Sequence, residues 1–145
     1  MEIHTIGFTQ KSAAEFFEAL RRAGIRRLID VRLNNTSQLA AFAKRDDLAY
    51  FLAEICGAEY YHRPELSPTK EILDAYKSGS MPWSEYEERF VDLLTRRKVE
   101  EALDKALFAV PSVLLCSEPT AEHCHRRIVA EYLAAKWGDV RIVHL

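Results

Sequence analysis

Five short apolar segments alternate along the chain with longer stretches in which apolar residues recur at helical spacing. Such segments are typical of β-strands when they are β-branched or fully apolar and end near glycine, proline or polar residues. The pattern predicts strands at residues 3–6, 27–32, 59–62, 113–116 and 140–144. The fourth segment, Val113-Leu114-Leu115-Cys116, is apolar throughout, as expected for a strand covered on both faces.

Helices are predicted between these strands. Two Ser-x-x-Glu sequences, Ser12–Glu15 and Ser84–Glu87, have the pattern of capping boxes, which begin helices. The first helix is expected to end at Gly24, and the helix that begins at Ser84 to break near Arg96. Further apolar stripes predict helices that end at Gly57, Gly79 and Gly138.

This alternation predicts a single α/β domain over residues 1–145. Strands joined through helices pair in parallel by right-handed crossovers, so we expect a Rossmann-like, three-layer α/β/α sandwich with a five-stranded, mainly parallel sheet. The expected strand order is 3-2-1-4-5. A chain of 145 residues is long enough to bury one core.

Composition and charge limit the cellular locations and the classes of partner to be expected. Twenty basic residues against 22 acidic ones leave a net charge of −2, which does not favour nucleic acid or an anionic membrane as a partner. The first residues lack the pattern of a signal peptide, and no apolar run approaches the ~18 residues of a membrane span. We therefore expect a cytoplasmic protein whose three cysteines are thiols.

Chemically active side chains follow several of the predicted strands. In open parallel sheets, ligands bind beyond the carboxyl ends of the strands. This rule selects a set of residues expected to face one cleft: Gly7, Asp30, Arg32, His62, Arg63, Glu65, Cys116 and Glu118.

The segment from Cys116 to Arg127 is the densest of these. Cys124 is expected at the amino terminus of a helix, where the helix dipole and nearby cations stabilise a thiolate. Arg126 and the free amides of the same helix could instead hold a phosphate or carboxylate. A third reading makes Cys116 a core residue, with His125 and Arg126 capping the helix.

Possible roles follow for the remaining candidates. Cys116 or Cys124 could be a nucleophile, and His125 or His62 could transfer protons. Asp30 could orient Arg126 or His125, or bond with Arg32 at the strand end. Glu65 and Glu118 are candidate acids by location alone. The aromatic residues Tyr60, Tyr61, Trp83 and Tyr86 could stack on a base or pack in the core.

Several known chemistries do not fit the spacing. Rhodanese-type sulfurtransferases and cysteine phosphatases place an arginine four to six residues after the cysteine, which neither Cys116 nor Cys124 satisfies. The usual nucleotide-binding glycine motifs are missing, and no cofactor is evident. A metal site is not expected, because His123, Cys124 and His125 should project about 100° apart on entering a helix.

The motifs together resemble the DUF488 family over nearly the whole chain. The resemblance is carried by Thr5-Ile6-Gly7, Asp30-Val31-Arg32, Phe42 with Leu48 and Leu52, Tyr61-His62 with Glu65-Leu66, and Leu115-Cys116-Ser117-Glu118 with Cys124-His125-Arg126. It implies a compact α/β fold with a site built from these positions, and no established reaction. Phe8 and Ser67 depart from the histidine and glycine common in the family.

We therefore expect a small enzyme, a Cys/His-dependent hydrolase or transferase, acting on an anionic or nucleotide-related ligand held by Arg32, Arg126 and the helix amino terminus. One alternative is a non-catalytic module that binds a ligand or nucleic acid, for instance in repair. Another is a metal-binding protein. The oligomeric state cannot be read from the pattern.

Overall fold

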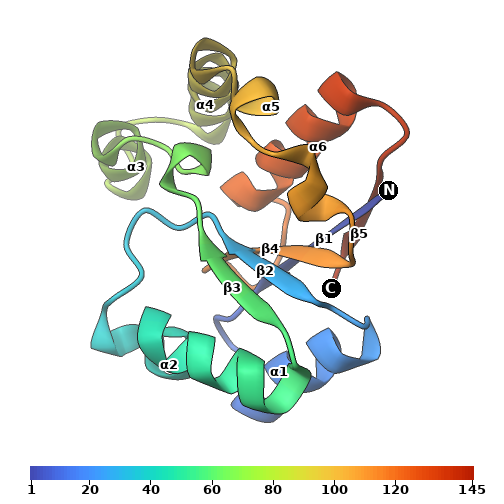
Figure 1. Cartoon of the computed structure of the whole chain (residues 1–145). Coiled ribbons are helices and arrows are strands. Elements are labelled where there is room, and N and C mark those ends of the chain that lie inside the picture. Colours follow the sequence, from blue (N-terminus) through green and yellow to red (C-terminus); the bar gives the residue numbers. More distant parts are fainter.

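The protein is a five-stranded parallel sheet with helices on both faces, and this confirms the predicted α/β class (Figure 1). The computed structural model describes all residues from 1 to 145. Helices α1 (Ala13–Arg22) and α2 (Arg45–Phe51) cover one face. The other helices cover the opposite face: α3 (Lys70–Lys77), α4 (Trp83–Arg97), α5 (Val99–Ala102) and α6 (His125–Trp137).

The strand order is β3-β2-β4-β1-β5, so the predicted order 3-2-1-4-5 was wrong at its centre. The strands are β1 (Glu2–Gly7), β2 (Arg27–Asp30), β3 (Glu59–His62), β4 (Ser112–Cys116) and β5 (Arg141–His144). Every residue of β4 is buried, whereas β3 and β5 are partly exposed. The fully apolar strand therefore takes the central place, between β2 and β1, where both of its faces are covered.

The strand register aligns the carboxyl ends of four strands along one edge. Gly7 pairs with Cys116, and Asp30 pairs with Leu115 on one side and with His62 on the other. Because all four strands run in the same direction, the segments that follow them emerge at the same edge. This edge carries most of the predicted functional residues.

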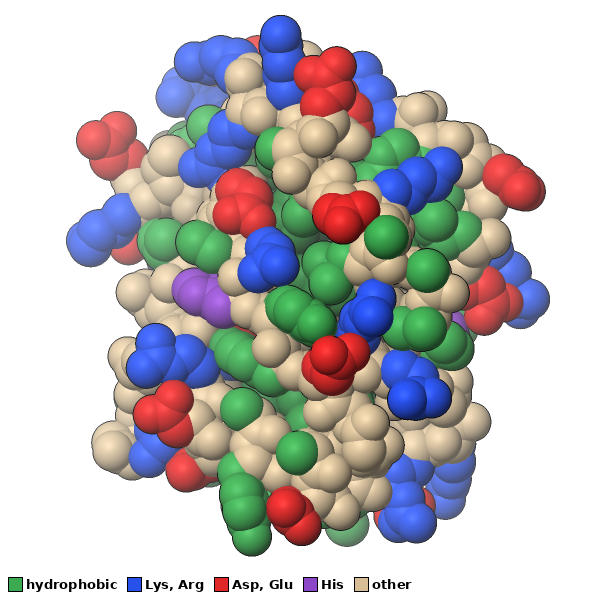
Figure 2. Space-filling model, viewed as in Figure 1, with side chains coloured by type: hydrophobic (Ala, Val, Ile, Leu, Met, Phe, Trp, Pro, Cys, Tyr) green, Lys and Arg blue, Asp and Glu red, His purple; other side chains and the backbone are tan.

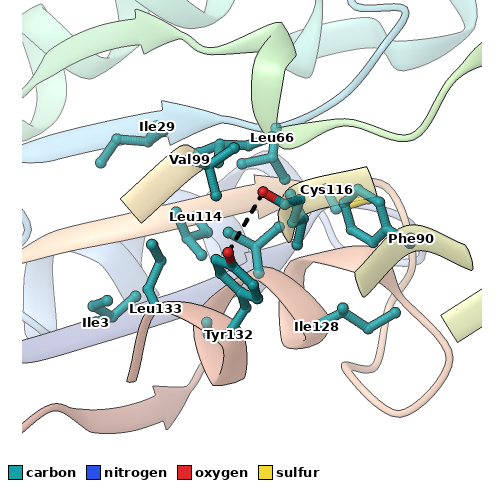
Figure 3. Close-up of a cluster of buried hydrophobic side chains, with 14 of the residues drawn as sticks. Ile3, Ile29, Leu66, Phe90, Val99, Leu114, Cys116, Ile128, Tyr132 and Leu133 are labelled. Atoms are coloured by element: carbon teal, nitrogen blue, oxygen red, sulfur yellow. Dashed lines mark hydrogen bonds between the residues drawn. The ribbon is translucent and has the colours of Figure 1, made fainter. Parts of the chain in front are cut away.

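Each face of the sheet has its own hydrophobic core. The core under α1 and α2 includes Ile6 and Phe16. The larger core on the other face includes Ile3, Leu114 and Cys116, and Figure 3 shows Cys116 at one end of it. Alternate strand residues point to opposite faces, so Cys116 belongs to the core that α6 covers.

The helix boundaries confirm one capping prediction and correct another. Both hydrogen bonds of the Ser12–Glu15 capping box are present at α1. The capping box predicted at Ser84 was wrong, because α4 begins at Trp83 after extended Pro82 and Ser84 already lies in the first turn. The predicted break near Arg96 is confirmed: α4 ends at Arg97, and Lys98 adopts a left-handed conformation before α5.

None of the helices combines the length and the apolar character needed to cross a lipid bilayer.

Candidate active site

A pocket of about 100 Å³ lies at the carboxyl ends of β2 and β4. The chain leaves β2 toward α2 on one face and leaves β4 toward α6 on the other, and such a divergence opens a crevice in a parallel sheet (Figure 1). Five of the residues predicted from the sequence line this pocket together: Arg32, Cys116, Glu118, Cys124 and His125. Arg32 of the Asp-Val-Arg segment and the first residues of α6 therefore lie at the same pocket, as predicted.

Cys116 and His125 are in direct contact at the base of the pocket. The His125 Nε2 lies 2.6 Å from the carbonyl oxygen of Val31, and Nδ1 lies 3.3 Å from the Cys116 Sγ. Because a carbonyl only accepts hydrogen bonds, we assign the ring proton to Nε2, which leaves the Nδ1 lone pair facing the thiol. A thiol facing a base that a third group orients is the arrangement of an activated nucleophile.

The surroundings lower the pKa values of both Cys116 and His125. Burial alone would raise the pKa of Cys116, but a hydrogen bond from the Cys124 thiol, the amides of Ser117 and Glu118 and the charge of Arg126 lower it overall. Burial lowers the pKa of His125 because charging the ring would cost desolvation energy. A neutral imidazole can accept a proton near pH 7.

Cys124 remains protonated beside this pair. Its contact with Cys116, followed by burial, raises the pKa of the Cys124 thiol well above its usual range. Cys124 is 2% exposed and caps the amino terminus of α6 without a side-chain cap hydrogen bond. The pKa values of the two predicted nucleophiles are therefore shifted in opposite directions.

The sulfur atoms of Cys116 and Cys124 and a ring nitrogen of His125 all lie within 4.8 Å of one another. Sequence reasoning expected His123, Cys124 and His125 to diverge. His123 does turn away and stacks on Trp83 with ring centroids 4.8 Å apart, but Cys124 and His125 both turn toward Cys116. Three soft donors could hold zinc only with a fourth ligand from solvent or substrate.

Arg32 and Asp30 form a buried ion pair beside the pocket. The Asp30 carboxylate accepts hydrogen bonds from Arg32 Nε at 2.9 Å and Nη2 at 2.8 Å, and further bonds from Asn35 and Tyr60. The carboxylate also accepts a hydrogen bond from the backbone N–H of Arg32. Strand β2 ends at Asp30, two residues earlier than predicted. Asp30 thus orients Arg32, and no hydrogen bond joins it to Arg126 or His125.

One atom of this network has no partner. The Arg32 Nη1 is buried and makes no hydrogen bond, although the guanidinium lies 5.3 Å from the centre of the Phe8 ring. An unpaired buried donor costs free energy, and a ligand that offers a hydrogen-bond acceptor to this nitrogen would remove that cost.

Arg126 lies outside the pocket and joins strand β1 to the segment that follows Cys116. Its Nη1 donates to the Glu118 carbonyl at 2.7 Å, and its Nε donates weakly to Thr5 Oγ1. Gly7 makes room for this arrangement, because a Cβ on Gly7 would lie 1.6 Å from the Glu118 carbonyl oxygen. These contacts position the segment after Cys116; a direct ligand-binding role of Arg126 and Gly7 stays a prediction.

His62 and Glu65 also lie away from the pocket. The His62 Nε2 is 2.9 Å from the carbonyl oxygen of Arg32, so its ring holds the segment after β2. Glu65 is 3.8 Å from Arg63 and lines a separate groove. His62 ends β3 and Glu65 follows it, and β2 separates β3 from β4, so the common edge did not bring either residue to Cys116. Their predicted roles in binding stay untested.

An aromatic wall faces the two cysteines across the pocket. Trp83 and Tyr86 stack with ring centroids 5.1 Å apart, and Tyr76 packs against both. The sequence had singled out Trp83 and Tyr86 as stacking candidates, whereas Tyr76, Lys77 and Asn34 were missed. Their only signal was position: α3 carries the first two, and the segment after β2 carries Asn34.

The surface shows acidic and basic side chains intermixed over the face in Figure 2, as the near-neutral net charge suggests. Several arginines are paired with acids on the same helix, for example Arg89 with Glu85 and Arg96 with Asp92. A broad basic stripe of the kind that binds nucleic acid is not seen on that face.

Comparison with known proteins gives one match. A family model described as "Domain of unknown function DUF488" matches residues 12–133, which include β2 to β4, the pocket and most of α6. No curated protein and no solved structure matches the chain. The match covers both cysteines and His125, and it begins after Gly7.

Proposed function

Because the chain belongs to the DUF488 family, whose description assigns no activity, we propose from the site itself that it is a thiol-dependent enzyme of the hydrolase or transferase type. The observation that supports this proposal is the Cys116–His125 contact on the wall of a pocket, with the opposite ring nitrogen held by the Val31 carbonyl. Cys116 is the nucleophile and His125 is the base.

The proposed step moves one proton and forms one bond. The Cys116 thiol gives its proton to His125 Nδ1, and the sulfur attacks an electrophilic centre of the ligand. As the sulfur–ligand bond forms, the bond to the leaving group breaks, and His125 returns the proton to that group. Water in a hydrolase, or a second substrate in a transferase, then releases the ligand from sulfur.

The proposed ligand is small and carries an anionic group. A volume of about 100 Å³ is below that of a drug-sized site, so it admits a small molecule or one group of a larger one. Arg32 offers its unpaired Nη1 as a hydrogen-bond donor, Lys77 on α3 supplies positive charge, and the rings of Trp83 and Tyr86 supply an apolar wall. A phosphate or carboxylate suits this combination.

Alkylation of the cysteines at different pH values tests the nucleophile. Because the pKa of Cys116 is lowered and burial raises that of Cys56, the alkylation rate of Cys116 should reach half its maximum below pH 8.5 and that of Cys56 above it. Each thiol is alkylated with iodoacetamide, and peptide mass spectrometry follows its rate separately. Each midpoint is read relative to the maximum rate of the same thiol, so the two midpoints can be compared although the thiols differ in exposure. A Cys116 midpoint at or above 8.5 contradicts the assignment.

A thermal-shift screen tests the ligand class. Inorganic phosphate, nucleotides and small carboxylates should include at least one that raises the melting temperature, since a ligand at 100 times its Kd adds about 2.7 kcal/mol of stability. Lys77→Ala should weaken that ligand about tenfold, the value of a charged hydrogen bond of ~1.5 kcal/mol. Lys70→Ala is the matched control, because Lys70 lies on the same helix outside the pocket. Equal effects of both variants would exclude this site for the anion.

A further inference from the structure

Cys124 is a second thiol placed against the proposed nucleophile. Both cysteines line the same pocket. Cys116 is 4% and Cys124 is 2% exposed to solvent. Their sulfur atoms lie within 4.8 Å of each other. A disulfide has a sulfur–sulfur bond of about 2.05 Å, so closing the gap needs a relative movement of less than about 3 Å.

The backbone between them allows such a movement. Residues 117–124 contain no helix and no strand, although they connect β4 directly to α6. Within this segment, Cys124 N–H makes one long hydrogen bond of 3.3 Å to the carbonyl of Ala121. The third cysteine, Cys56, packs with the core on the opposite face of the sheet, where it cannot reach either of the others.

We propose that Cys116 and Cys124 form a peroxide-reducing pair, in which Cys116 is oxidised first and Cys124 resolves it as an intramolecular disulfide. The inference rests on the proposed function in one respect, because it uses the same Cys116 thiolate. It adds a second substrate class, hydroperoxides, and a partner class, a dithiol reductant.

The reaction balances over two steps. The Cys116 thiolate attacks the terminal oxygen of a peroxide, so the O–O bond breaks, sulfur becomes a sulfenic acid and the remaining alkoxide or hydroxide takes up a proton. The Cys124 thiol then attacks that sulfur, the disulfide forms and water leaves. A dithiol returns both cysteines to thiols and is itself oxidised by two electrons.

The site provides for each step. The amides of Ser117 and Glu118 and the charge of Arg126 lower the pKa of Cys116 and so favour the thiolate, the form that peroxides oxidise. The neighbouring His125 Nδ1 can take the Cys124 proton when Cys124 attacks, since all three side chains lie within 4.8 Å. The disulfide would also remove the nucleophile, so oxidation should silence the proposed thiol-dependent activity.

The test is oxidation of the whole chain with an equimolar amount of hydrogen peroxide. After alkylation of the remaining thiols, non-reducing peptide mapping should show a Cys116–Cys124 disulfide and a free Cys56, with full recovery after dithiothreitol. The Cys56→Ser variant should behave identically. In Cys124→Ser, oxidation should stop at a sulfenic acid on Cys116 that dimedone traps, with no intramolecular disulfide.

Other outcomes overturn the inference. A disulfide that includes Cys56, or direct over-oxidation of Cys116 in the unaltered chain, would exclude Cys124 as the resolving thiol. If the alkylation midpoint of Cys116 is low but no disulfide forms, the inference fails and the proposed function stands. One equivalent of tightly bound zinc in the purified protein, shown by elemental analysis, would overturn both, because the same three side chains would then be ligands. If Cys124→Ser does not fold, mapping of the unaltered chain still decides.

Discussion

Replacing Gly7 with alanine is expected to lower the free energy of unfolding by about 3 kcal/mol or more, at the upper end of the range for overpacked sites. The added Cβ would lie 1.6 Å from the Glu118 carbonyl oxygen and 2.7 Å from its carbonyl carbon. Both atoms belong to the backbone, so no side-chain rotation relieves the clash. The Arg126 Nη1, 2.8 Å from the same Cβ, would be displaced as well.

Gly24→Ala is the matched control for this prediction. Gly24 has a φ of +68°, but nothing lies within 4 Å of the added Cβ, so its cost of about 1–2 kcal/mol is left-handed backbone strain alone. Urea denaturation of both variants measures the two costs. If Gly7→Ala were no more destabilising than Gly24→Ala, the segment after Cys116 would be mobile enough to retreat, and the close approach would have no role in placing it.

Replacing Asp30 with alanine is expected to cost about 3–5 kcal/mol, because it leaves the Arg32 guanidinium buried without a counter-charge. Arg32 and Asp30 are 2% and 0% exposed, and the carboxylate accepts two side-chain hydrogen bonds from the guanidinium. Asp74→Ala provides a comparison, because it breaks an exposed pair with Lys70 and should cost at most about 0.5 kcal/mol.

A double variant separates the ion pair from simple loss of packing. Replacing Asp30 with alanine and Arg32 with methionine removes both charges, so it should be more stable than Asp30→Ala alone even though it changes more atoms. If the double variant were the less stable of the two, the buried charge of Arg32 would not be the source of the cost.

The same carboxylate predicts a dependence of stability on pH. Burial would raise the pKa of Asp30, but the hydrogen bonds and charge of Arg32, with a bond from Tyr60, hold it below its usual range. A carboxylate with a lowered pKa in the folded state contributes stability that is fully present above its unfolded pKa of about 3.9 and is lost as the pH falls through the folded value. Unfolding free energies measured from pH 7 to pH 3 should therefore fall less steeply in Asp30→Asn.

The fold class could be predicted from local patterns because each pattern has a local physical cause. The Ser12 capping box forms within one helical turn, and the apolar run of β4 is dictated by burial on both faces. The prediction at Ser84 failed because a local sequence match does not exclude an N-cap two residues earlier, at Pro82. The strand order failed because pairing joins residues far apart in the chain, as with Gly7 and Cys116.

The candidate site shows the same division. Parallel strands share a direction, so the sequence was enough to place Arg32, Cys116 and the Cys124–His125 dipeptide at one edge. It could not tell which of the neighbouring side chains turn into the pocket. Arg126 donates a hydrogen bond to the Glu118 carbonyl and His62 contacts the Arg32 carbonyl, so neither side chain lines the pocket.

The sequence by itself determined the alternation of strands and helices. It also determined the edge of the sheet at which the candidate site residues lie, and which cysteines are candidates for a reactive thiol. Only the tertiary structure decided that β4 lies between β2 and β1, that Asp30 is paired with Arg32, and that Cys116 faces both His125 and Cys124. The reason is the distance along the chain between the residues that interact. Helical spacing, capping and strand burial depend on neighbours within a few residues, whereas the direction of a buried polar side chain depends on which distant groups pack around it and satisfy its hydrogen bonds.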